Sequence, residues 1–113
     1  MALNCLGFAK ILLAKVRWPE EAQRHALLAA STLALQRALM LCAENSRAMV
    51  LGNLGYSLFL AGQHHSAKAP TLECLKLGGE EQLEAQRADA EKHRVEPEDS
   101  HYSQLLDELW RSL

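Results

Sequence analysis

The stretch VLGNLGYSLFLAG, residues 50–62, combines helix-forming leucines with glycines at positions 52, 55 and 62. A glycine inside a helix costs about 0.5–1 kcal/mol relative to alanine, so these glycines need a reason in packing or in turn geometry. Leu51, Leu54, Gly55 and Leu58 recur at helical spacing and therefore predict a helix whose contact face includes a glycine. Gly62 is predicted to end this helix in a left-handed turn.

The composition around this stretch predicts one all-α domain. The chain has 113 residues, of which 49% are hydrophobic and 23% charged, and leucine, alanine, glutamate, glutamine and arginine dominate over β-branched types. The net charge is −2 and no basic cluster alternates with aromatic residues, so we expect no nucleic-acid partner. The longest apolar run, residues 27–43, is interrupted by Gln36 and Arg37 and is shorter than the ~20 residues that span a bilayer, so we expect no membrane partner.

Proline and glycine divide the chain into segments with helical periodicity. The boundaries predict six helices, over residues 2–16, 19–44, 46–61, 65–77, 80–94 and 97–113. Pro70 is expected to kink the fourth helix or tighten its first turn. In the last helix, one face is expected to be buried because it carries the large side chains Tyr102, Leu105, Leu106, Leu109 and Trp110.

The chain also repeats itself. LGFAKILLA (6–14) and LGYSLFLAG (54–62) both read Leu-Gly-aromatic-small followed by large aliphatics, and the two glycines are separated by 48 positions. Each copy is followed by an alanine that opens a second helix, Ala22 and Ala67 respectively. Self-similarity at 20–50 residues is typical of stacked helical hairpins. In such a hairpin we expect Gly55 to allow close approach of the partner helix at Ala67.

These residues resemble the tetratricopeptide repeat (TPR). Residues 48–79 match the family pattern at the spaced positions Leu54, Gly55, Gly62, Ala67, Cys74, Leu75 and Leu77. They depart from it at Leu51, Leu58, Thr71 and Gly79, where the family has Trp, Tyr, Phe and Pro. The resemblance implies antiparallel hairpins stacked as a short right-handed superhelix of about six helices.

The resemblance divides the single domain, residues 1–113, into three parts. Residues 1–45 form a variant repeat with a long second helix, residues 46–79 the best-matching repeat, and residues 80–113 a capping helix pair. The chain begins three residues before NCLGF, as if an array had been cut into, so an isoform or a fragment of a longer repeat protein is one hypothesis. An exposed apolar side on the first helix is the corresponding expectation.

The ionisable residues do not predict catalysis. His64 and His65 lie in a predicted turn without metal-ligand spacing to a cysteine, so no metal site is expected. Cys5, Cys42 and Cys74 each lie in an apolar run and are predicted to be buried thiols, typical of a reducing compartment. We therefore expect a non-enzymatic protein without a cofactor. Its predicted location is the cytoplasm; the basic, acid-poor segment before Glu20 keeps a mitochondrial alternative.

The resemblance implies a protein–protein interaction scaffold whose concave surface, lined by first helices, binds a peptide or helix of another protein. Some TPR relatives hold a terminal carboxylate with lysine, asparagine and arginine side chains; here only Asn53 and Arg87 match, while Phe8, Cys5 and Leu83 occupy the other positions. The predicted partner-binding residues are Phe8, Lys10, Asn53, Tyr56 and Arg87.

Charge is divided unevenly along the chain. Residues 1–79 carry eight Lys or Arg against four Asp or Glu, whereas residues 80–113 carry four against ten. One interpretation of this uneven distribution is that the two halves expose solvated surfaces of opposite charge. The functional interpretation is that the basic half, residues 1–79, binds an acidic partner. The alternative function is a structural subunit whose open end completes a helical stack, as a homo-oligomer or hetero-oligomer through the N-terminal helix.

Overall fold

The computed structural model describes residues 2–113, and within them all regular structure is helical. The elements are α1 (Ala2–Val16), α2 (Glu21–Leu41), the short 3-10 helix η1 (Glu44–Ser46), α3 (Arg47–Leu60), α4 (His64–Glu91) and α5 (Glu98–Arg111). The all-α prediction is confirmed. None of the helices in this part of the chain is long and apolar enough to cross a membrane.

The number of helices differs from the prediction, because α4 runs through the predicted break and the described chain has five α-helices instead of six. Gly79 nevertheless has non-helical angles, φ 62° and ψ −151°, and α4 changes direction there. This backbone region is essentially restricted to glycine. At Pro70 the backbone keeps helical angles, since Gly79 alone has non-helical angles inside α4. The second helix is also shorter than predicted, because Cys42 and Ala43 are extended.

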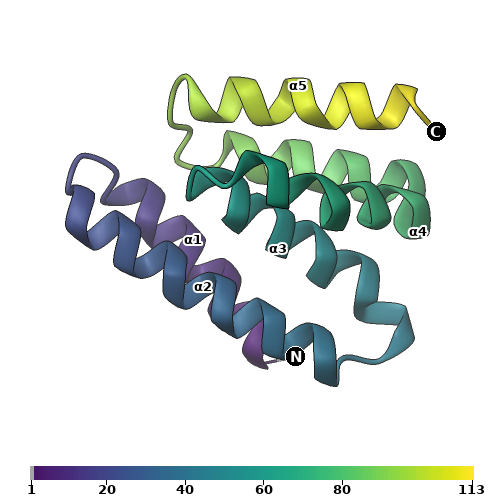
Figure 1. The fold of residues 1–113 in the computed structure, drawn as a ribbon, viewed down its shortest axis with the longest axis horizontal. Helices are drawn as coiled ribbons and strands as arrows, with labels where there is room; N and C mark the ends of the chain where they lie inside the picture. Colours follow the sequence, from purple (N-terminus) through teal and green to yellow (C-terminus); the bar gives the residue numbers. More distant parts are fainter. Residues whose placement is uncertain (1) are drawn as a thin grey trace.

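The helices form three neighbouring pairs (Figure 1). The first pair is α1 and α2, the second is α3 with the part of α4 before Gly79, and the third is the part of α4 after Gly79 with α5. The chain therefore passes from one side of the molecule, at α1 and α2, to the other at α5.

The second pair packs through the predicted glycine contact. A Cβ on Gly55 would lie 2.1 Å from Thr71 Oγ1 and 3.3 Å from the Ala67 carbonyl oxygen, so only glycine fits between α3 and α4. Gly62 has φ 85° and ends α3 in the predicted left-handed turn. Gly55, the second glycine of the stretch 50–62, is thus explained by close helix packing.

In the first pair, the alanine equivalent to Ala67 makes no such contact. Ala22 is exposed, whereas Gly7 packs beneath Leu35, whose Cγ would lie 2.5 Å from an added Cβ. Ser31 Oγ donates a hydrogen bond of 2.8 Å to the Gly7 carbonyl oxygen. The contact of Gly7 lies far from the turn, because both helices of this hairpin extend well beyond it before they reach the turn.

The core runs through all three pairs. The predicted face of α5 is buried: Tyr102, Leu105 and Leu106 belong to the core, and Leu109 and Trp110 pack against it. In the second part of α4, Leu83 is the large apolar residue that reaches the core. The outer side of the first pair differs, because large apolar side chains of α1 remain exposed there.

Candidate binding groove

One groove of about 310 Å³ is lined by one helix from each pair. α1, α3 and the second part of α4 supply its walls: Asn4, Cys5, Phe8, Met49, Asn53, Gln82, Ala85, Gln86 and Asp89. The surface combines apolar side chains with four carboxamides. Such a mixture is typical of sites that take up apolar groups and fix them with a few hydrogen bonds.

Two buried carboxamides join α1 to α3 in this groove. Asn53 Nδ2 donates a hydrogen bond of 3.0 Å to Asn4 Oδ1. Within residues 2–113, no hydrogen bond occupies the amide nitrogen of Asn4 or the amide oxygen of Asn53, so one remains a donor and the other an acceptor. The Asn4–Asn53 pair therefore offers a donor for the carbonyl oxygen of a peptide group and an acceptor for its N–H.

A third carboxamide forms part of the groove wall and is anchored from behind. Gln86 Oε1 accepts a hydrogen bond of 2.8 Å from Tyr102 Oη on α5. A Cβ on Gly52 would lie 2.4 Å from Gln86 Nε2, so the glycine on α3 makes room for this side chain. Gln86 is consequently held in one position between α3 and α5.

The charged group in the groove wall is a carboxylate that is paired with a lysine. Asp89 is the one charged residue in its lining among residues 2–113, and burial raises the pKa of its carboxyl group above the usual value. Lys92 Nζ lies 3.3 Å from Asp89 Oδ1 and 5.4 Å from the centre of the Phe8 ring. Among residues 2–113, no basic side chain that could hold a terminal carboxylate lines the groove.

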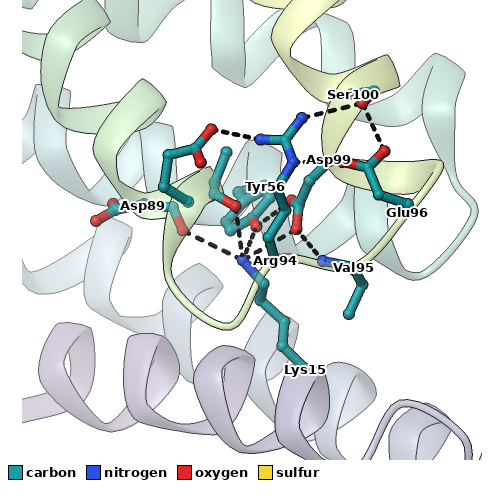
Figure 2. A network of polar contacts seen from close by, with 10 residues as sticks. Lys15, Tyr56, Asp89, Arg94, Val95, Glu96, Asp99 and Ser100 are labelled. Carbon is teal, nitrogen blue, oxygen red and sulfur yellow. Dashed lines mark hydrogen bonds and ion pairs between the residues drawn. The ribbon is translucent and has the colours of Figure 1, made fainter.

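A buried polar network joins α1, α3, α4 and α5 and reaches the groove wall at Asp89. Figure 2 shows its side chains. Lys15 Nζ from α1 lies 3.1 Å from Asp99 Oδ2 of α5 and donates a 2.7 Å hydrogen bond to Tyr56 Oη of α3. It also donates bonds of 3.2 Å to the carbonyl oxygens of Asp89 and Ala90 at the end of α4. Tyr56 Oη donates in turn to Asp99 Oδ1 at 2.5 Å.

The network satisfies charges that would otherwise be costly to bury. The side chains of Lys15 and Asp99 have no exposed surface, and an ammonium group in such a place is tolerated only when it is paired and hydrogen-bonded. Burial lowers the pKa of Lys15, while the hydrogen bond and charge of Asp99 act in the opposite direction. Burial, together with Asp99, raises the pKa of Tyr56, which therefore keeps its proton.

Asp99 also fixes the chain between α4 and α5. Its Oδ2 accepts a 2.8 Å hydrogen bond from the Val95 backbone nitrogen. Arg94, at the same turn, forms ion pairs with Glu91 and Glu96 at the surface (Figure 2). The network thereby sets the position of the second part of α4, and with it one wall of the groove.

The structure brings two of the five predicted partner-binding residues into the groove, Phe8 and Asn53. Tyr56 lies outside the groove lining, and its side chain is fully buried in the Lys15 network. Lys10 is half-buried on α1 outside the groove lining. Arg87 lies on the other side of α4, where it pairs with Glu84 at 3.0 Å and with Asp107 at 2.6 Å.

Sequence reasoning missed Asn4, Lys15 and Asp99 as site residues. The first two share the buried face of α1 with Gly7 and Ile11, and this helical register was the available signal. Asp99 stands in the first turn of α5, where an acidic residue is favourable in any helix, and nothing local distinguishes that role from a buried ion pair.

The cysteine prediction is correct for one residue. Cys74 is buried, and burial raises the pKa of its thiol to about 12. Cys42 is partly exposed, while Cys5 is exposed in the groove because it lies off the buried face of α1. Over residues 2–113, no cluster of three or more His, Cys, Asp or Glu side chains could hold a metal ion.

Comparison with known proteins adds no relative. No protein-family model matches the chain, and the searches of curated proteins and of solved structures found no significant match either.

Proposed function

We propose that this protein is a non-enzymatic interaction scaffold of the TPR type, which binds an extended segment of another protein in the groove between α1, α3 and α4. The observation that carries the proposal is the composition of the groove, to which one helix of each pair contributes. A TPR-like stack exposes its first helices on one concave surface, and α1, α3 and the second part of α4 are the first helices of the three pairs.

The groove chemistry favours a peptide with an apolar side chain and little negative charge. Phe8, Met49 and Ala85 offer apolar contact, and the Asn4–Asn53 pair offers a donor and an acceptor to a peptide backbone. Asp89 disfavours an acidic segment. The three free cysteines favour a reducing compartment, and we place this function in the cytoplasm.

The test is a selection of random twelve-residue peptides displayed on phage, using the wild-type protein as bait. Ala85→Arg is the blocking variant, because Ala85 is exposed and lines the groove. Ala88→Arg is the matched control, since it adds the same side chain to an exposed position of the same helix outside the groove. Selected peptides should bind Ala85→Arg at least about tenfold more weakly than wild type, and Ala88→Arg equally well.

A synthetic acidic peptide with a free terminal carboxylate is the comparator, and we expect it to bind more weakly than the selected peptides. Enrichment of no peptide, or binding that Ala85→Arg leaves unchanged, would contradict the proposal. Asn53-dependent binding of the acidic peptide would instead support a carboxylate clamp.

The alternative function, a structural subunit that completes a helical stack, is favoured by a separate observation. Leu6, Leu13 and Val16 of α1 are exposed on the outer side of the first pair. Apolar side chains gathered on one helix face are typical of an interface.

A further inference from the structure

The exposed side chains of α1 follow a heptad pattern. Ala2, Leu6, Ala9, Leu13 and Val16 are separated by steps of four, three, four and three residues, and all five are exposed. The three large side chains expose 48%, 45% and 52% of their surface. Residues at this spacing form a straight stripe along a helix, which is the arrangement that a second, nearly aligned helix covers. We call these five residues the α1 seam.

No helix of the described chain covers the seam. α1 packs against α2 and α3, and its buried residues Asn4, Gly7, Ile11, Ala14 and Lys15 lie on the opposite face. Figure 1 shows α1 and α2 at the border of the molecule, on the side away from α5. The seam is therefore open along the whole length of the helix.

The charges beside the seam are positive. Lys10 and Arg17 lie next to it, and α1 contains no acidic residue. Lys10 forms no ion pair within residues 2–113, and Arg17 has one exposed partner, Glu20, at 3.7 Å. A second copy of α1 would bring the same cations against them, and like charges at the edges of a helix pair oppose association.

From this spacing, exposure and charge, we propose that the α1 seam binds an amphipathic helix of a partner protein, with leucine-sized residues at heptad positions and acidic residues beside them. The partner's helix would lie along α1 with an inclination of about 20°, its apolar side chains between Leu6, Leu13 and Val16. Its carboxylates would face Lys10 and Arg17. This site is separate from the groove, which lies on another side of α1.

The probe is a synthetic peptide of three heptads with leucine at both apolar positions and glutamate at the flanking ones. Glutamate repulsion keeps this peptide from pairing with itself, so it is available to the protein. A second peptide carries lysine at the same flanking positions. Both are labelled, and binding is followed by fluorescence anisotropy at about 50 mM and about 500 mM salt.

The acidic peptide should bind the wild-type protein about threefold to tenfold more tightly than the basic one, and the difference should shrink at high salt. Leu13→Glu should weaken its binding at least about tenfold, and Lys10→Glu should reverse the preference between the two peptides. Leu33→Glu and Lys68→Glu are matched controls at exposed positions of α2 and α4, and should bind like wild type. Circular dichroism establishes that each variant is folded, and Leu13→Gln replaces Leu13→Glu if that variant is not.

Three results would overturn the proposal. The first is that neither peptide binds, and the second is that both bind equally at low salt. The third is a wild-type dimer in sedimentation equilibrium that Leu13→Glu dissociates, because a second copy would then cover the seam. Loss of binding in Ala85→Arg would assign the peptide to the groove and would likewise overturn the assignment to α1.

Discussion

Asp99→Asn should remove most of the stability that the buried network provides. The substitution keeps the size of the side chain but leaves the Lys15 ammonium buried at 3.1 Å from a neutral amide. Breaking a buried ion pair by neutralising one partner costs about 3–5 kcal/mol. A domain of 113 residues has a total unfolding free energy of about 5–15 kcal/mol, so the variant should lose a large share of it.

Urea unfolding followed by circular dichroism measures this loss, and Asp107→Asn is the matched control. Asp107 accepts a bond of 2.6 Å from Arg87, but both side chains are nearly half exposed. An exposed ion pair contributes about 0–1 kcal/mol, so this control should remain close to wild type. Equal losses in the two variants would refute the reasoning that burial makes the Asp99 pair important.

The double variant with Lys15→Met separates the ion pair from the other contacts of Asp99. Removing both charges should cost less than the sum of the single losses, with a coupling of at least about 1.5 kcal/mol. Additive losses would show that Asp99 acts through its hydrogen bonds to Tyr56 and Val95 and not through the charge of Lys15.

Three further predictions concern the backbone, the packing and the pH dependence. Gly79→Ala should lower the unfolding free energy by about 1–3 kcal/mol in urea titrations, because φ 62° and ψ −151° suit glycine alone; an unchanged midpoint would contradict this. Gly55→Ala should destabilise by about 1–3 kcal/mol because the new Cβ meets Thr71 Oγ1, and Thr71→Ala in the same chain should restore part of the loss. A thermal melt of the two variants that shows no such rescue would exclude this clash. The raised pKa of Cys74 means that the unfolded chain releases the thiol proton first, so stability should fall from about pH 9 toward pH 12, and less steeply in Cys74→Ala. Parallel slopes of urea midpoint against pH in the two proteins would refute that assignment.

The parts of the fold that local sequence determines were predictable. Gly55 stands at helical spacing among leucines, so its place in a close helix contact follows from periodicity, and Gly62 follows from turn chemistry. The buried face of α5 follows from the spacing of its large side chains. The extent of α4 did not follow, because a glycine pair stops a helix in some settings and in others only redirects it.

The parts that depend on distant residues were not predictable. Lys15 of α1 and Asp99 of α5 are far apart in the sequence and meet only in the folded molecule. Each also has a common local explanation, because Lys15 is a basic residue in the last turn of a helix and Asp99 an acidic residue in the first turn of one. Tyr56 occupies the aromatic position that follows Gly55, which gives no indication whether the ring faces outward or inward. Phe8 and Asn53 lie in the same groove lining because α1 and α3 both contribute to its walls.

The Lys15–Asp99 pair has a consequence for how the molecule unfolds. In linear arrays of helical hairpins, each unit touches only its neighbours, and terminal units can open while the rest stays folded. Here the ammonium group of Lys15, in the first pair, is paired with the carboxylate of Asp99, in the last pair. If either end of the molecule opens, the charged group at the other end loses its partner. Amide protons of α1 and α5 should therefore exchange with solvent in one cooperative event, and the three pairs should behave as a single unfolding unit.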